Sequence, residues 1–98
     1  MAFTIVWSPT ARFDLRDILS YISEFDPAAA ASFGRNVFDS IERLIDFPES
    51  GRIVPEFRDP TIREIIRKPC RIIYRLQKEE AIVEIARIWH AARGIPAI

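Results

Sequence analysis

The sequence predicts an α+β domain in which a helical hairpin packs on one face of a small, mostly antiparallel sheet. Two segments in the first half carry apolar residues at helical spacing, and each opens with a capping residue followed by proline. Three segments rich in β-branched residues follow in the second half, separated by turn residues. With one short strand candidate ahead of the helices, the predicted order is β-α-α-β-β-β. Two helices packed on one face of a single sheet are the simplest arrangement for that order.

Ser8-Pro9 and Asp26-Pro27 open the two predicted helices, because serine and aspartate cap helices and proline fits the first helical position. Apolar residues then recur in steps of three and four, so each helix has one stripe that we expect to be buried. The stripes are Ala11, Leu15, Ile18, Leu19 and Ile22 on the first helix, and Ala30, Phe33, Val37, Ile41, Leu44 and Ile45 on the second. Phe47-Pro48 ends the second helix, and the two helices form an antiparallel hairpin.

The predicted strands are residues 3–7, 62–67, 70–76 and 81–89. Residues 46–60 are predicted to be a loop, since proline and glycine punctuate them. Along residues 70–76, successive side chains are expected to point to opposite faces of the strand, and this period-two pattern is the clearest in the chain. We expect one set to face the helices and the other to face outward; the sets are Cys70, Ile72, Tyr74 and Leu76, against Arg71, Ile73, Arg75 and Gln77. The last strand is apolar on both faces, which leaves its inward side open.

Charge is balanced over the whole chain but not within it. The 98 residues suffice for one domain, 1–98, and carry 14 basic and 14 acidic residues. Residues 1–51 have a net charge of −4 and residues 52–98 a net charge of +4. Arginines inside apolar strands predict a working surface, because burying an unpaired charge is costly. Overall neutrality nevertheless disfavours a tight, non-specific nucleic-acid binder, whose affinity comes largely from phosphate neutralisation.

Several classes of site are disfavoured by composition. The single cysteine, Cys70, excludes an internal disulfide and an all-cysteine metal site, and the three glycines are too scattered to cradle a phosphate. We therefore expect no metal and no cofactor. No apolar run approaches the roughly 20 residues of a membrane-spanning helix, and the first residues lack the basic start of a secretion signal. The cytoplasm is the expected location, with no membrane partner.

A set of short motifs resembles one family over nearly the whole chain. In order, they are Trp7-Ser8-Pro9-Thr10-Ala11 with Asp14-Leu15, Pro27-Ala28-Ala29, Phe47-Pro48-Glu49-Ser50-Gly51-Arg52, Val54-Pro55-Glu56, Arg63-Glu64-Ile65, Tyr74-Arg75, and Trp89-His90-Ala91-Ala92-Arg93. Together they resemble toxins of the RelE/ParE superfamily, the toxic half of bacterial type II toxin–antitoxin or plasmid-stabilisation modules. The resemblance implies a small sheet with a helical hairpin on one face.

The resemblance implies two alternative activities. RelE-like members are ribosome-dependent messenger-RNA endonucleases, whereas ParE-like members inhibit growth by poisoning DNA gyrase. Three features favour the ParE-like alternative: net neutrality, the His90-Ala91-Ala92-Arg93 ending, and the lack of a counterpart to the RelE lysine pair, since Lys68 and Lys78 lie in other segments. A cognate antitoxin, with an amphipathic and partly disordered segment, is the expected partner in a hetero-oligomer. Arg63, Arg67, Arg71, Arg75 and Arg93 are the residues expected to contact the antitoxin or the target.

The endonuclease alternative assigns three roles by resemblance. Glu56 would be the base that activates the 2′-hydroxyl, Arg71 the clamp on the phosphate, and His90 the acid for the leaving oxygen. The aromatic residue that follows in the YoeB-like branch is missing here, because Ala91 succeeds His90. A third alternative is a degenerate member that binds its antitoxin without poisoning any target.

Overall fold

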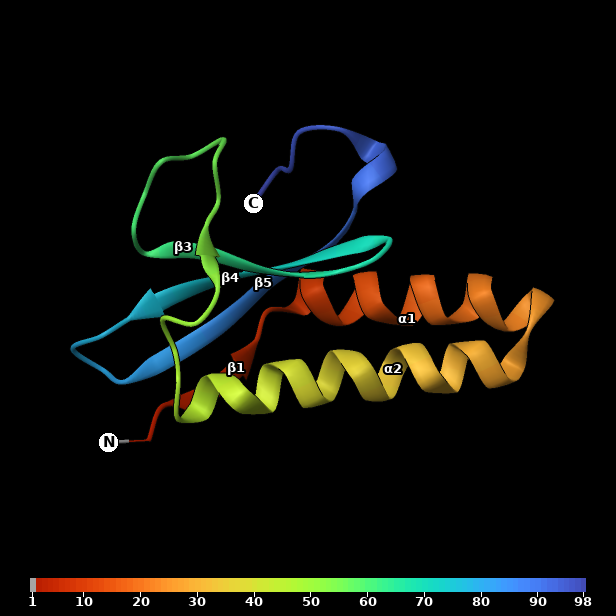
Figure 1. Cartoon of the computed structure of the whole chain (residues 1–98), viewed down its shortest axis with the longest axis horizontal. Coiled ribbons are helices and arrows are strands. Elements are labelled where there is room, and N and C mark those ends of the chain that lie inside the picture. Colours follow the sequence, from red (N-terminus) through yellow and green to blue (C-terminus); the bar gives the residue numbers. More distant parts are fainter. Residues whose placement is uncertain (1) are drawn as a thin grey trace.

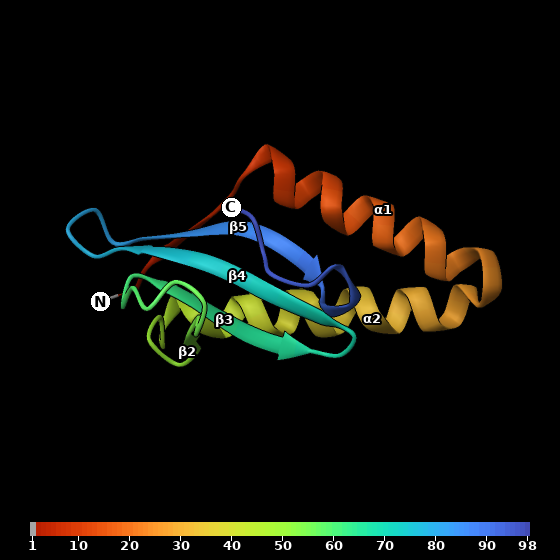
Figure 2. The same cartoon turned by 90° about the horizontal axis from the view of Figure 1, so that it is seen from above.

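The computed structural model describes residues 2–98 and confirms the predicted class and element order. The elements are β1 (Thr4–Trp7), α1 (Pro9–Phe25), α2 (Pro27–Glu42), the 3₁₀ turn η1 (Arg43–Ile45), β2 (Arg52–Ile53), β3 (Ile62–Arg67), β4 (Cys70–Gln77), β5 (Ile82–His90) and the 3₁₀ turn η2 (Ala91–Arg93). They form one five-stranded sheet in the order β1-β5-β4-β3-β2, with both helices against one face (Figures 1 and 2).

The sheet is mixed. β1 runs parallel to β5, and the other three pairings are antiparallel. The connections between consecutive strands from β2 to β5 are too short for a parallel crossover, whereas β1 and β5 are separated by most of the chain and are free of that constraint. The predicted loop at residues 46–60 also contains the two-residue strand β2, which adds a fifth strand at the sheet edge.

The two helix caps form as predicted. The Ser8 hydroxyl accepts the backbone N–H of Ala11 at 3.0 Å, and the Asp26 carboxylate accepts that of Ala29 at 3.1 Å. The apolar stripe of α1, however, is buried only in its first half, at Ala11 and Leu15. The helical hairpin extends beyond the end of the sheet (Figure 1), so Ile18, Leu19 and Ile22 remain half-buried. The prediction of a fully buried stripe is wrong for that half.

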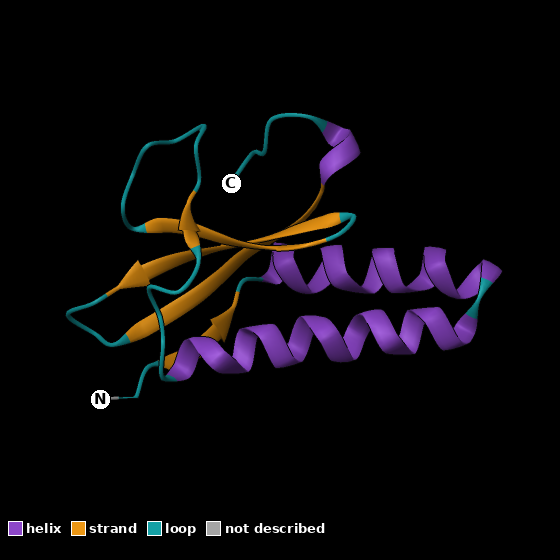
Figure 3. Cartoon of the chain, viewed as in Figure 1, coloured by secondary structure: helices purple, strands orange, loops and turns teal. Residues whose placement is uncertain are grey.

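The inward set predicted for β4 is confirmed, since Cys70, Ile72, Tyr74 and Leu76 all lie in the main core between sheet and helices. Ile73 lies on the opposite face but is fully buried there, with Val54 and Trp89. The loop between β2 and β3 and the C-terminal segment cover this face (Figure 3). A second, smaller core therefore exists where the alternation alone predicted an outward residue.

The inward side of β5 changes along the strand. Val83 and Ile85 face the main core, and so does Ile88, three residues further on. Ile73 of β4 pairs with Arg87 while its neighbour Tyr74 pairs with Ile85, so Ala86 is an extra residue in β5. Such a β-bulge shifts the period-two pattern by one position. No single alternation could assign this strand from the sequence.

Helix α1 completes the edge of β5 where β1 ends. The Ser8 hydroxyl donates to the carbonyl of Ala86 at 2.9 Å, and the buried carboxylate of Asp14 accepts the backbone N–H of Ile88 at 3.1 Å. Arg87 donates two hydrogen bonds to the same carboxylate, at 2.7 and 3.0 Å. Asp14 thereby satisfies a backbone donor and supplies the carboxylate partner of Arg87, whose guanidinium also donates to the carbonyl of Ala97 at 2.9 Å.

Replacing Asp14 with alanine should destabilise the fold by about 3 kcal/mol, because Arg87 loses its only counter-charge among the described residues and the Ile88 N–H loses its acceptor. Urea unfolding measures the difference. Asp17→Ala is the matched control, since Asp17 is exposed on the same helix, and its effect should stay within about 0.5 kcal/mol. Equal stability of the two variants would contradict the assigned role of Asp14.

Candidate functional site

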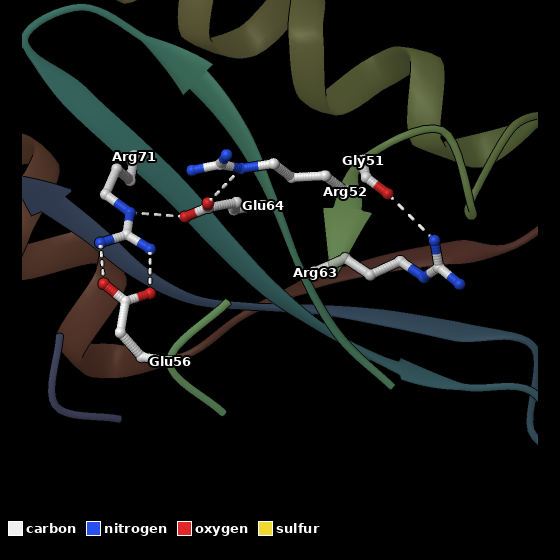
Figure 4. Close-up of polar contacts among 6 residues, drawn as sticks. All are labelled: Gly51, Arg52, Glu56, Arg63, Glu64 and Arg71. Atoms are coloured by element: carbon white, nitrogen blue, oxygen red, sulfur yellow. Dashed lines mark hydrogen bonds and ion pairs between the residues drawn. The ribbon is translucent and has the colours of Figure 1, made fainter. Parts of the chain in front are cut away.

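Four charged residues gather on the sheet face opposite the helices (Figure 4). Glu64 of β3 has a fully buried side chain, and each of its carboxylate oxygens accepts from one arginine. Arg52 Nε of β2 lies 2.6 Å from one oxygen, and Arg71 Nε of β4 lies 2.5 Å from the other. The two terminal nitrogens of Arg71 bind the carboxylate of Glu56 at 2.9 and 2.7 Å. We call these four residues the outer-face charge cluster.

The sheet register explains why the cluster forms. Glu64 pairs directly with Arg52 across β2 and β3, and with Ile73 across β3 and β4. Directly paired residues lie on the same face of a sheet, so Glu64 points into the smaller core, where a carboxylate needs partners. Two arginines and two carboxylates make the cluster neutral as a unit. It therefore offers no uncompensated charge to a ligand in this arrangement.

The pairing changes the acid–base properties of Glu56. Its hydrogen bonds with Arg71 lower the pKa of Glu56 from 4.5 to about 2. The same contact, followed by the hydrogen bond with Glu64, raises the pKa of Arg71 above its ordinary value. A general base works best with a pKa near the operating pH. A carboxylate with a pKa of about 2 is a poor base at neutral pH.

His90 lies at the end of β5 and is not hydrogen-bonded to the cluster within residues 2–98. Its Nδ1 accepts the backbone N–H of Ala92 at 3.1 Å and so caps η2. The register places His90 opposite Cys70 and its neighbour Trp89 opposite Arg71, which puts His90 and Arg71 on different faces of the sheet. Both nevertheless line a groove of about 480 Å³ around the β3–β4 turn. The structure thus brings Glu56 and Arg71 into contact, whereas His90 shares only the groove with Arg71 and lies on the other face of the sheet.

Arg63 connects the segment before β2 with the end of the loop before β3. Its guanidinium donates to the carbonyls of Pro60 at 3.0 Å, Glu49 at 3.2 Å and Gly51 at 3.0 Å (Figure 4 shows the last). The Glu49 carboxylate lies 3.6 Å away. These contacts occupy much of the donor capacity of Arg63. Its predicted contact with a partner stays a prediction.

The remaining predicted arginines lie in different surroundings and do not form one patch. Arg75 pairs with Glu84 at 3.3 Å, across β4 and β5. Arg67 donates to the carbonyl of Ile66 at 2.9 Å near the end of β3. Arg93 stacks over the ring of Trp89, 4.2 Å from its centroid. Their contact with an antitoxin or target likewise stays a prediction.

Arg52 and Glu64 are members of the cluster that the sequence interpretation did not single out. An acidic residue at the centre of the apolar run Ile62–Arg67 was the available signal for Glu64, because a charge in such a strand requires a partner. Arg52 gave no comparable signal. It belongs to a two-residue strand in a segment predicted to be a loop, so only the tertiary pairing places it beside Glu64.

A tight contact positions the segment that carries Arg52. The Tyr74 hydroxyl accepts the N–H of Gly51 at 2.9 Å and donates to the carbonyl of Pro48 at 2.9 Å. A Cβ at Gly51 would lie 2.4 Å from that hydroxyl and 2.7 Å from the backbone oxygen of Glu64. Only glycine fits there without a shift of the backbone.

Comparison with known proteins identifies the family. The sequence model described as "ParE toxin of type II toxin-antitoxin system, parDE" matches residues 5–95. The chain belongs to this family and hence to the RelE/ParE superfamily of type II toxin–antitoxin toxins. It is 34% identical over 94 residues to Toxin RelE1 of Caulobacter vibrioides, covering 92% of this chain and 95% of that one. It is 31% identical over 96 residues to the putative toxin Y4kP of Sinorhizobium fredii, covering 96% and 94%.

Two solved structures share the fold. The structure titled "Chromosomal ParDE TA system from P. aeruginosa" superposes with a TM-score of 0.73 at 20% identity, covering 91% of this chain and 96% of that one. The toxin–antitoxin complex RelBE2 from Mycobacterium tuberculosis superposes with a TM-score of 0.59 at 24% identity, covering 92% and 99%. In residues 2–98, no helix is long and apolar enough to cross a membrane, and no three potential ligands cluster to hold a metal ion.

The Glu56–Arg71 pair should make stability depend on pH in the acidic range. The folded-state pKa of Glu56, about 2, lies below its ordinary value of 4.5, so its stabilisation is present above pH 4.5 and is lost as pH falls toward 2. Urea midpoints measured from pH 7 to pH 2.5 should fall more steeply for the wild type than for Glu56→Gln. Parallel curves would contradict the pairing.

Gly51→Ala should destabilise the fold by about 2 kcal/mol, because the added methyl collides with Tyr74 and with the backbone of β3. Gly34→Ala is the informative control, since a Cβ there meets Leu19 at an ordinary 3.6 Å and the position is helical. That substitution should be neutral or should stabilise by about 0.5 kcal/mol. Thermal unfolding of both variants tests the contrast.

Proposed function

We propose that this toxin inhibits growth in the ParE-like manner, by binding a protein target, DNA gyrase, in the cytoplasm, and that a cognate antitoxin neutralises it. The observation that carries the proposal is the internal pairing of the candidate nuclease residues. Both terminal nitrogens of Arg71 are occupied by Glu56, and its Nε by Glu64. Three of the five N–H donors of that guanidinium are thereby used, and the paired edge that would clamp a phosphate is occupied while the pairing holds.

RNA cleavage also requires a general base and a general acid, and the two candidates for these roles are engaged in other contacts. Glu56, with a pKa of about 2, is a poor general base, and the Nδ1 of His90 is engaged in capping η2. Binding to nucleic acid depends on uncompensated cations. Four of the five arginines in β2 to β4 face a carboxylate, and Arg67 alone makes no ion pair among the described residues; the four are Arg52, Arg63, Arg71 and Arg75. These contacts support a mode of action through protein–protein contact.

The outer side of the helical hairpin supports an antitoxin site. A groove of about 510 Å³ is lined by apolar side chains and by two arginines; its residues are Trp7, Arg12, Leu15, Arg16, Leu19 and Phe38. Arg12 and Arg16 make no ion pair among the described residues. An amphipathic helix with acidic residues flanking its apolar face fits such a groove. Antitoxin segments of this kind are expected to order on binding.

Brief induction of the toxin should produce gyrase-dependent DNA breaks and an SOS response while messenger RNAs stay intact. His90→Ala should keep this toxicity. The nuclease alternative uses His90 to donate a proton, and binding to gyrase requires no proton transfer. Sequencing of RNA ends and of DNA breaks from the same culture gives both readouts. Ribosome-dependent cuts that disappear in Arg71→Ala or His90→Ala would overturn the proposal.

One observation favours a ribosome-dependent endonuclease as the second candidate. Arg71 and His90 line the same groove, so a rearrangement that freed Arg71 from Glu56 would leave a cation near an imidazole. The experiment above distinguishes this candidate by its codon-resolved cuts. A third candidate, a member that binds its antitoxin without toxicity, would give neither cuts nor breaks.

A further inference from the structure

The two carboxylates that bind Arg71 differ in how firmly they are held. Glu64 is fixed by the pairing of β3 with both neighbouring strands, and its side chain is fully buried. Glu56 lies in the loop between β2 and β3, and its side chain is 30% exposed. The loop is anchored on either side of it, by Val54 and Phe57 in the smaller core. Glu56 can therefore swing into solvent by a change of its own side chain, without movement of the loop.

The departure of Glu56 would create an anion site. Arg71 would keep its contact with Glu64 and would present two parallel N–H donors, the arrangement that binds a carboxylate in a bidentate manner (Figure 4). The cluster would then contain Arg52 and Arg71 against Glu64 alone, a net charge of +1. One external carboxylate restores neutrality. The site is thus matched to a single negative group.

The surroundings of this site favour an acidic peptide over RNA. The adjacent groove of about 480 Å³ has apolar walls that include Ile66, Pro69 and Ala91, and Lys68 and His90 also line it. Ile66 is 38% exposed, so it is available for contact. Of the other cations near this site, Arg75 is paired with Glu84, and Lys68 makes no ion pair among the described residues, so a single further free cation lines the groove. A nucleic acid needs several such contacts, whereas an acidic side chain with apolar neighbours needs one.

We propose that Glu56 is an internal competitor for this site: Arg71 is a docking point for an acidic side chain of the protein partner, and Glu56 occupies it until that partner binds. This inference rests on the proposed function, in which the chain acts through protein contacts. A tethered carboxylate acts at an effective concentration of about millimolar. It weakens the binding of free anions from solution and yields more readily to a carboxylate delivered by a partner that is already bound elsewhere.

A titration that needs no identified partner tests the competition. The probe is a synthetic peptide of alternating leucine and glutamate, followed through the NMR signal of the Arg71 Nε–H. Its apparent dissociation constant should fall roughly fivefold in Glu56→Gln and Glu56→Ala, because the competing ion pair is lost. The same peptide with glutamine in place of glutamate should bind no better to the variants than to the wild type.

Two further variants control the measurement. Glu49→Gln removes the same charge from the preceding loop, where the carboxylate contacts Arg63 and Lys78 instead, and should leave the affinity unchanged. Arg71→Lys keeps the positive charge but loses the paired donors, so in combination with Glu56→Ala it should abolish the gain, as followed by intrinsic tryptophan fluorescence. Thermal unfolding of each variant confirms that the fold is retained.

Unchanged peptide affinity in both Glu56 variants would overturn the inference. A gain for a single-stranded oligoribonucleotide without a gain for the acidic peptide would also overturn it, in favour of a phosphate site. Neither result bears on gyrase-dependent breaks, which are measured separately in cells. Conversely, an absence of such breaks would overturn the proposed target and would not change the conclusion drawn from the peptide titration.

Discussion

The buried carboxylate of Glu64 is the interaction on which the outer half of this structure depends. A carboxylate removed from water at the centre of a sheet requires strong hydrogen-bond donors on both oxygens. Arg52 from β2 and Arg71 from β4 supply them, so three strands are joined by one charge. Arg71 in turn binds Glu56 and fixes the loop that covers Ile73 and Trp89. Neutrality of the outer-face charge cluster follows from this pairing.

A second buried carboxylate has the same structural role on the other side of the molecule. Asp14 binds Arg87 and the backbone of Ile88, and it thereby attaches α1 to β5 beyond the point where β1 ends. In both places the guanidinium of a strand arginine is paired with a carboxylate from another element. Several of the arginines that looked like a working surface therefore stabilise the fold. The surface left to a partner is more apolar and less basic than the composition of residues 52–98 suggests.

The backbone is shared within the family, whereas the mode of action differs, and the distribution of charge bears on the mode of action. The helical hairpin and the sheet are common to ParE-like and RelE-like toxins, so the fold alone does not select the target. The internal pairing of charged side chains on the open sheet face supports the proposed contact with a protein target. In the proposed competition, Glu56 controls access to Arg71, whose Nε and both terminal nitrogens are hydrogen-bonded.

The sequence by itself determined the order of elements, the caps at Ser8 and Asp26, the inward face of β4 and the family, because each depends on local periodicity or on short motifs. It also placed Glu56 and Arg71 among the residues of interest. Only the tertiary structure decided the bulge at Ala86, the second core around Ile73 and the partners of every arginine. Those depend on which residues of distant strands come into register, and a charge acquires its role only when its counter-charge is known.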